Sequence, residues 1–507
     1  MTISGKSLIA GQWLGDTSHG FYAFNPQLNK PMDYLINETN PKDLATAIAR
    51  AQEAFTSYSQ LDAMHRAKFL KIIGEQILAL GDELIEVACA ETGLPEARII
   101  GERGRTIGQL NLFAQQLLEQ EYLPVIERAD TEREPLPKPD TRLGYLPIGV
   151  VGVFGASNFP LAFSTAGGDT ASALAAGCPV VMKAHVAHPG TAELVARAIS
   201  HAIELCDIDA GVFSLIQGKD YALSTQLVQH PFVKAIGFTG SERVGMILQT
   251  QINERPDPIP FYGELGSLNP QFILPSVIEA KATQTAAMFV NSLMMGQGQF
   301  CTSPGLWVVI KDSHYHSFEQ AAISELSKQA AGVMLTPEIK AAYDSSVEKW
   351  NSLSGVECLA RGQQGKPFEC QAALFQCDLN TFIDNKVLQD EVFGPAALII
   401  TCEDDSQMAQ LVSLLKGNLT ATIHAESFDY LLAESLCNSL SHKVGRLIFN
   451  QMPTGVEVCS AMNHGGPFPA STDVRTTSVG SKAIERFRRP ICYQNLPQDF
   501  LPALLKG

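Results

Sequence analysis

The sequence has few positive charges for its length. Its 507 residues contain 37 lysines and arginines against 53 aspartates and glutamates, which gives a formal net charge of −16. Nucleic-acid backbones and anionic membrane surfaces both select basic protein surfaces. The charge balance therefore argues against nucleic acid or a membrane as the main partner, and leaves a small molecule as the expected one.

Long hydrophobic runs and closely spaced cysteines are also missing. No apolar stretch reaches the ~20 residues that a bilayer-spanning helix needs, and residues 1–20 do not pair a basic segment with an apolar one as a secretory signal does. The 11 cysteines include no CxxC pair, so neither a zinc ribbon nor a thioredoxin motif is offered and no metal site is expected. We expect a protein of the reducing cytoplasm.

Short apolar runs alternate with helical segments along most of the chain. The run 149–155 is typical of a buried strand, and similar runs follow at 179–184, 212–217 and 232–240 with helices between them. A second series of the same kind begins after residue 284. Such alternation predicts parallel sheets covered on both faces, with ligands beyond the carboxyl ends of the strands. The fold class predicted is therefore α/β.

An irregular segment interrupts this pattern between residues 128 and 142. It carries prolines at the alternate positions Pro135, Pro137 and Pro139. Alternating prolines forbid a helix and favour extended backbone. The segment is either a linker or an extended arm that binds a neighbouring subunit, and periodicity does not separate the two.

Two residues have the chemistry of a catalytic pair. Cys301 follows the turn Gly298-Gln299-Phe300 between a predicted helix and a strand, where a thiol can act as a nucleophile. Glu264 is flanked by Gly263 and Gly266 and could serve as a general base. Each residue also has a non-catalytic interpretation. Cys301 could be a buried thiol, and Glu264 could be a solvated carboxylate in a loop.

Two further stretches could bind an oxyanion or a phosphate. Asn158 stands at the end of the first predicted sheet strand, where its amide can stabilise a developing oxyanion, although turn asparagines are equally common. Gly240-Ser241 joins a strand to a helix N-terminus, a geometry that binds phosphate groups. The stretch is not the full GxGxxG fingerprint, so alone it is a weak cofactor signal.

Taken together and in this order, the motifs resemble those of the aldehyde dehydrogenase superfamily over most of the chain. The matching segments are Ser157-Asn158-Phe159-Pro160, Val181-Met182-Lys183, Phe238-Thr239-Gly240-Ser241, Gly263-Glu264-Leu265-Gly266, Gly298-Gln299-Phe300-Cys301 and Glu391-Val392-Phe393-Gly394-Pro395. The resemblance implies a Rossmann-type cofactor domain, a second α/β catalytic domain and an oligomerisation arm. We expect the nucleotide-binding domain at 1–127 and 146–264, the catalytic domain at 265–455, and the arm at 128–145 and 480–500. The arm implies a homodimer or a dimer of dimers.

The resemblance also implies a mechanism. Cys301 attacks the aldehyde carbon, Asn158 and the Cys301 backbone N–H stabilise the oxyanion, and Glu264 activates the water that hydrolyses the resulting thioester. The residues implied to bind the cofactor are Lys183, Gly240, Ser241, Glu391 and Phe393. A cysteine hydrolase or acyltransferase that needs no cofactor is the alternative from another class of enzyme.

One departure bears on the choice of cofactor. Many family members that prefer NAD carry an acidic residue three positions after the lysine, and this chain has Val186 there. Without that carboxylate a 2′-phosphate is not repelled, and Lys183 attracts it. We expect NADP as the cofactor, with NAD also possible.

The C-terminal part is similar to the branch of the family that contains α-ketoglutarate semialdehyde (2,5-dioxopentanoate) dehydrogenases. The similarity lies in the segments 450–458 and 464–470. An acidic ketoaldehyde needs a cationic anchor, for which Arg105 and Arg475 are candidates, each with a surface ion pair as its alternative. NADP-dependent long-chain fatty aldehyde dehydrogenases are close relatives in the same branch, and such a substrate needs an apolar tunnel. The candidates for that tunnel are Phe113, Leu117, Phe159 and Phe468.

Overall fold

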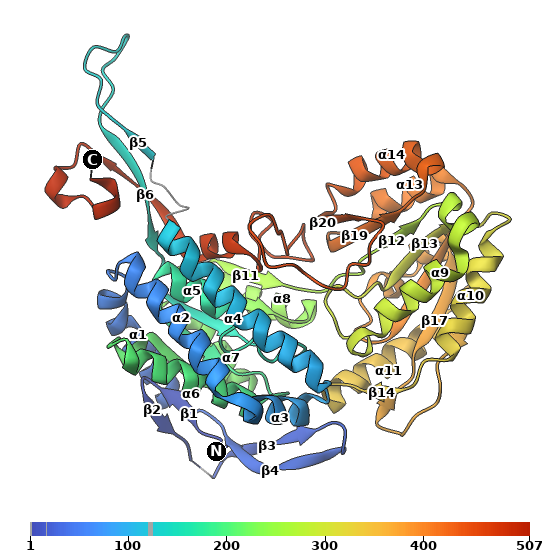
Figure 1. Ribbon diagram of the computed structural model, residues 1–507, viewed down its shortest axis with the longest axis horizontal. Helices are drawn as coiled ribbons and strands as arrows, with labels where there is room; N and C mark the ends of the chain where they lie inside the picture. Colours follow the sequence, from blue (N-terminus) through green and yellow to red (C-terminus); the bar gives the residue numbers. More distant parts are fainter. Residues whose placement is uncertain (1–2, 17, 120–124, 507) are drawn as a thin grey trace.

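The computed structural model describes residues 3–16, 18–119 and 125–506. Figure 1 shows two bodies, each built around a sheet, that lie side by side, and a thin arm that leaves the first of them. Within the described residues, no helix combines the length and the apolar character that crossing a bilayer requires.

The first body contains a seven-stranded sheet in the order β11-β10-β7-β8-β9-β1-β2. Its strands are β1 (Ser7–Ile9), β2 (Gln12–Leu14), β7 (Val150–Phe154), β8 (Val180–Lys183), β9 (Phe213–Ile216), β10 (Val233–Thr239) and β11 (Phe261–Glu264). The strands from β11 to β9 are parallel, as predicted, whereas β1 and β2 add an antiparallel edge. That edge was not predicted, because three-residue strands are too short to show a period in the sequence.

Helices cover both faces of this sheet. One face packs against α2 (Ala63–Ala79), α4 (Glu96–Glu119), α5 (Gly168–Ala176) and α6 (Pro189–Leu205), with α3 (Gly81–Thr92) beside them. The other face packs against α1 (Pro41–Tyr58), α7 (Tyr221–Gln229) and α8 (Glu242–Asn253). Successive residues of a strand point to opposite faces, so Val150 joins one core and Val151 the other.

The second body repeats this arrangement. Its sheet has the order β15-β17-β18-β13-β12-β19-β20, and only β15 runs antiparallel to its neighbour. The strands are β12 (Gln271–Ile273), β13 (Leu306–Ile310), β15 (Glu357–Arg361), β17 (Ala373–Asp378), β18 (Ala396–Cys402), β19 (Asn418–His424) and β20 (Val444–Phe449). The helices are α9 (Pro275–Met294) and α10 (Tyr315–Ser327) on one face, and α11 (Pro337–Ser352), α12 (Leu379–Asp384), α13 (Asp405–Leu414) and α14 (Tyr430–Leu440) on the other.

The arm is a three-stranded sheet formed by segments that are far apart in the sequence. Strand β6 (Thr141–Pro147) pairs with β5 (Val125–Glu127) on one side and with β21 (Arg488–Gln494) on the other, both antiparallel. In Figure 1 it projects away from both bodies. The remaining strands form two small pairs, β3 (Gly20–Asn25) with β4 (Lys30–Asn37) and β14 (Gly332–Val333) with β16 (Glu369–Cys370).

Candidate active site

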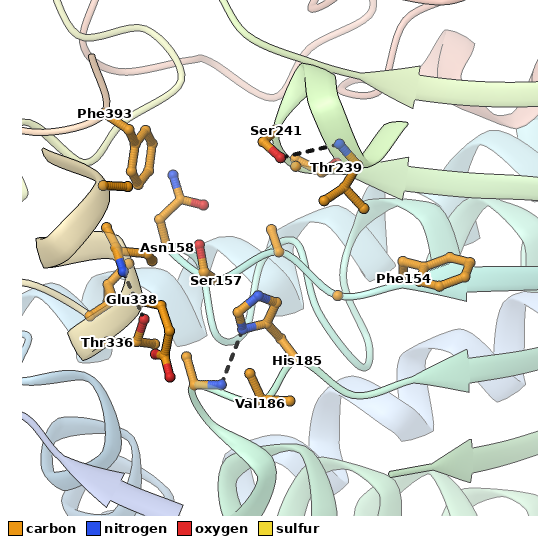
Figure 2. A pocket seen from close by; sticks show the side chains of 18 of the residues that line it. Phe154, Ser157, Asn158, His185, Val186, Thr239, Ser241, Thr336, Glu338 and Phe393 are labelled. Atoms are coloured by element: carbon orange, nitrogen blue, oxygen red, sulfur yellow. Dashed lines mark hydrogen bonds between the residues drawn. The ribbon is translucent and has the colours of Figure 1, made fainter. Parts of the chain in front are cut away.

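A cavity of about 950 Å³ opens at the carboxyl ends of the first sheet's strands, where the two bodies meet. The loops after β7, β8 and β10 line it from one side, and the first turn of α11 lines it from the other. Figure 2 shows Asn158, His185 and Ser241 from the first body and Thr336 and Phe393 from the second around the same space. This is the location expected for a ligand of a doubly wound sheet.

Cys301 stands at the wall of this cavity, on the turn that leads from α9 to β13. Gly298 shapes that turn, since its φ is +66° and a Cβ there would stand 2.2 Å from the carbonyl oxygen of Gly394. Only glycine tolerates both conditions. The Nδ2 of Asn269 then holds the turn, donating a hydrogen bond of 2.8 Å to the carbonyl oxygen of Cys301.

Glu264 and His464 join Cys301 in a tight cluster. Their side-chain donor and acceptor atoms all lie within 4.8 Å of one another. The Nε2 of His464 is 3.5 Å from the Sγ of Cys301 and 2.9 Å from the Oε1 of Glu264. A thiol, an imidazole and a carboxylate are also a donor set for zinc, but here each faces another member of the cluster.

Charge and burial set the protonation of this cluster. Burial raises the pKa of Glu264, but His464 and a hydrogen bond of 2.6 Å from the hydroxyl of Ser478 to Oε2 outweigh it, so the pKa lies below its usual value. Burial, with the nearby carboxylate of Glu264, raises the pKa of the Cys301 thiol well above its usual value. The thiol therefore keeps its proton until a neighbouring base accepts it, and the carboxylate and the imidazole are both within reach.

Asn158 presents an amide to the same space. It lies just after β7, lines the cavity and is 8% exposed. Its Nδ2 donates a hydrogen bond of 2.8 Å to the carbonyl oxygen of Gln299, two residues before the thiol. A primary amide has two N–H groups, so one remains for a ligand oxygen.

The far part of the cavity has the features of a dinucleotide site. Ser241 caps α8, its Oγ accepting a hydrogen bond of 3.4 Å from the backbone N–H of Val244, and the preceding Gly240 keeps the backbone accessible. Lys183 donates a hydrogen bond of 3.0 Å to the carbonyl oxygen of Gly218. Burial lowers the pKa of this lysine to about 8.

Glu391 and Phe393 complete that part of the cavity from the second body. Burial raises the pKa of Glu391 to about 8, and a Cβ on Gly266 would stand 2.8 Å from its Oε2. A buried carboxyl group that faces a cavity suits a ribose hydroxyl, which can accept or donate a hydrogen bond. Together with the helix N-terminus at Ser241, these residues fit a nicotinamide dinucleotide.

A second group of residues lies near Cys301 without lining that cavity. The ring of Phe159 is 5.4 Å from the ring of Phe300 and 5.2 Å from that of Phe163. The guanidinium of Arg105 lies 5.5 Å from the Phe163 ring centre and interacts electrostatically with Cys301. Of the six predicted substrate residues, the structure brings Phe159 and Arg105 to the thiol.

The other four predicted substrate residues lie elsewhere. Phe113 and Leu117 are buried in the helical core of the first body, where long apolar side chains on one face of α4 pack against neighbouring helices, and the tunnel predicted there is wrong. Arg475 is exposed, and its guanidinium pairs with Asp473 at 3.0 Å, so the ion-pair alternative holds. Phe468 is 53% exposed and does not line the cavity.

Sequence reasoning missed three residues near the thiol, namely His464, Ser478 and Arg446. His464 belongs to a segment noted for family similarity, but its role depends on contacts with residues more than 160 positions away. Ser478 also stands in a segment similar to the family, Thr477-Ser478-Val479-Gly480, whereas Arg446 has no local signal. Glu338 was also missed, and it lines the cavity near Val186 (Figure 2).

Comparison with known proteins shows what the whole chain is similar to. A profile described as "Aldehyde dehydrogenase family" matches residues 13–485. An alpha-ketoglutaric semialdehyde dehydrogenase of Azospirillum brasilense is 47% identical over 99% of this chain and 96% of its own, and one of Acinetobacter baylyi is 44% identical with the same coverage. A betaine aldehyde dehydrogenase of Staphylococcus aureus in complex with NAD+ has a TM-score of 0.83 at 21% identity, covering 98% and 96% of the two chains, which shows a shared fold.

Proposed function

We propose, from the premise that the chain belongs to the aldehyde dehydrogenase family, that its substrate is 2,5-dioxopentanoate and its product 2-oxoglutarate. Oxidation of an aldehyde to a carboxylic acid with NAD(P) is the activity of the family. The proposed substrate is supported by the names of the two relatives described above. The observation that carries the proposal is the guanidinium of Arg105, whose Nε and Nη2 are buried without a hydrogen-bond partner, since an aldehyde with a carboxylate tail needs a cation. This guanidinium lies 5.5 Å from the Phe163 ring centre, which is 6.2 Å from that of His464, the neighbour of Cys301.

The first step is the attack of the Cys301 sulfur on the aldehyde carbon. The thiol proton passes to the adjacent cluster of Glu264 and His464, and the new C–S bond converts the carbonyl oxygen to an oxyanion. The remaining N–H of Asn158 and the backbone N–H of Cys301 stabilise that oxyanion. Donors that are held in place before the reaction are worth about 3–4 kcal/mol each in such a step.

The second step is hydrolysis of the thioester that Cys301 holds after oxidation. When bound, the nicotinamide dinucleotide supplies the hydride acceptor. Glu264 removes a proton from a water molecule, the hydroxide adds to the thioester carbon, and the C–S bond breaks. The acid leaves, the sulfur regains a proton from the cluster, and the second proton that the cluster has taken up passes to solvent.

NADP is the proposed cofactor, with NAD as a second one. Val186 lines the cavity where a carboxylate would repel a 2′-phosphate, and the cations Lys183 and Lys219 line the same region. The test is the ratio of kcat/KM for NADP to that for NAD. We expect Val186→Glu to lower this ratio at least ~10-fold through like-charge repulsion, and Val186→Gln to serve as the matched neutral control. A wild-type enzyme with a strong NAD preference would defeat this proposal.

A fatty aldehyde is the alternative substrate, but two of its four predicted tunnel residues lie in the core. A panel of 2,5-dioxopentanoate, succinate semialdehyde and pentanal, each with both cofactors, tests the assignment through the appearance of reduced nicotinamide. The proposal requires the highest kcat/KM for 2,5-dioxopentanoate. Preference for neutral aldehydes would support the fatty-aldehyde alternative, and ester hydrolysis without cofactor as the sole activity would support a hydrolase.

The arm is proposed to bind a neighbouring copy of the chain, giving a homodimer or a dimer of dimers. It exposes Val125, Leu136 and Tyr145, which are 54%, 69% and 46% exposed, and apolar side chains on a projecting sheet favour a partner surface. We also propose that residues 1–127 and 146–264 form the nucleotide-binding domain, residues 265–455 the catalytic domain, and residues 128–145 and 480–500 the arm. Light scattering on the full chain tests the assembly, and a monomer would contradict it.

A further inference from the structure

Arg446 reaches the neighbourhood of Cys301 from the second body. It belongs to β20, and the residue before it touches the loop that carries His464, because a Cβ on Gly445 would stand 2.2 Å from the carbonyl oxygen of Gly465. His464 in turn lies 3.5 Å from the Sγ of Cys301. The loop is held against β20, because the Nδ2 of Asn463 donates a hydrogen bond of 3.1 Å to the carbonyl oxygen of Gly445. Arg105 reaches the same histidine through Phe163, whose ring centre lies 5.5 Å from the Arg105 guanidinium and 6.2 Å from the His464 ring centre.

The guanidinium of Arg446 is held in one orientation. Its Nη1 donates a hydrogen bond of 2.8 Å to the carbonyl oxygen of Gly455, and its Nη2 donates one of 2.5 Å to that of Pro453. Its Nε is buried and has no hydrogen-bond partner. A guanidinium carries five N–H groups, and the two bonds to carbonyl oxygens fix its plane, so the Nε–H has a defined direction.

The guanidinium of Arg105 offers a complementary set of donors. Its Nε and Nη2 are both buried without a partner. These two nitrogens form the edge of a guanidinium that binds both oxygens of a carboxylate at once. The ring centres of Phe159 and Phe163 lie 5.9 Å and 5.5 Å from its central carbon, so the group rests on aromatic faces that restrict its motion.

Among the described residues, Glu102 and Glu264 are the carboxylates that attract Arg105. The nearest acids are already engaged, because Glu102 pairs with Arg98 and Glu264 with His464. Two like charges that share a buried region repel each other, and unpaired buried donors carry a further cost. An anion that binds between them removes both costs.

We propose that Arg105 and Arg446 together form the site for the oxo-acid end of the substrate, an inference that rests on the proposed function. Arg105 binds the carboxylate through N–H groups on its Nε and Nη2. Arg446 donates its Nε–H to the 2-oxo oxygen. Arg446 is then a specificity-determining residue, because an aldehyde without these oxygens leaves the donors unpaired.

The experiment compares kcat/KM for 2,5-dioxopentanoate, succinate semialdehyde and pentanal in five enzymes. These are the wild type, Arg105→Gln, Arg446→Gln, Arg446→Lys and the control Arg475→Gln, which removes an exposed arginine of equal charge. We expect Arg446→Gln to lower kcat/KM roughly 10- to 100-fold for 2,5-dioxopentanoate, by a smaller factor for succinate semialdehyde, and by under about 3-fold for pentanal. Arg446→Lys should retain part of the preference, and the control should retain all of it.

The outcomes separate this inference from the function on which it rests. A wild-type enzyme that prefers pentanal overturns the proposed function. If the wild type prefers the oxo-acid while Arg446→Gln lowers kcat/KM equally for all three substrates, Arg446 only stabilises its loop. If Arg446→Gln lowers kcat/KM for none of them, Arg446 has no role in binding. Either result shows that the inference is wrong. If Arg446→Gln does not fold, Arg105→Gln provides the test. If Arg105→Gln still has a higher kcat/KM for 2,5-dioxopentanoate than for pentanal, the result supports Arg446. If Arg105→Gln has no such preference, the inference is overturned.

Discussion

Replacing Glu264 by glutamine should make the Cys301 thiol more acidic while slowing turnover. The carboxylate and the sulfur lie within 4.8 Å of each other. At an effective dielectric constant of ~20, two unit charges at that distance repel by about 3.5 kcal/mol. His464 offsets part of this repulsion, so we expect the pKa of Cys301 to fall in the variant, and burial to keep it above its usual value.

Two assays measure the two halves of this prediction. The rate of alkylation by iodoacetamide as a function of pH gives the pKa of the thiol, and Glu338→Gln is the matched control, since it removes a carboxylate that lines the same cavity but does not belong to the cluster of Cys301, Glu264 and His464. Rapid mixing with aldehyde and cofactor should give one equivalent of reduced nicotinamide, followed by turnover slowed by ~10²–10⁴-fold. An unchanged or higher thiol pKa, or turnover at the wild-type rate, would refute the reasoning.

Three further predictions follow from individual contacts. In Ser478→Ala, loss of the hydrogen bond to Glu264 should raise the pKa of that carboxyl, so the acidic limb of the kcat profile moves to higher pH; an unmoved limb contradicts this. In Gly298→Ala, the positive φ and the close approach of Gly394 should lower the free energy of unfolding by ~2–4 kcal/mol in chemical denaturation, whereas Gly101→Ala, with open space at its Cβ, should not. Because the pKa of Lys183 is about 8, KM for NADP relative to that for NAD should rise between ~pH 7 and ~pH 9, and a constant ratio would argue against contact with the 2′-phosphate.

Much of the fold was predictable because its signals are local. The parallel strands β7, β8 and β10 are short apolar runs bounded by glycine or polar turns, and the helices between them show a clear period. The start of α1 also has a local signal, because Asn40 caps the helix and Pro41 stands in its first turn. The antiparallel edge β1-β2 was not predictable, because pairing with β9 depends on residues some 200 positions away.

The residues of the site also fall into those with a local sequence signal and those placed by long-range packing. Cys301, Glu264 and Asn158 stand in local motifs, and the structure brings them to one cavity. His464 and Arg446 reach the thiol only through the packing of the loop after β20 against the first body. The apolar period of α4 could not tell a tunnel from a core, because both need the same residues at the same spacing.

The covalent role of Cys301 is tested most directly by mass spectrometry of the Glu264→Gln enzyme after mixing with 2,5-dioxopentanoate and NADP. With hydrolysis slowed, the peptide that contains Cys301 should carry the mass of the 2-oxoglutaryl group, and Cys301→Ala should carry none and show no turnover. An unmodified peptide in the first enzyme, or undiminished turnover in the second, would contradict the mechanism.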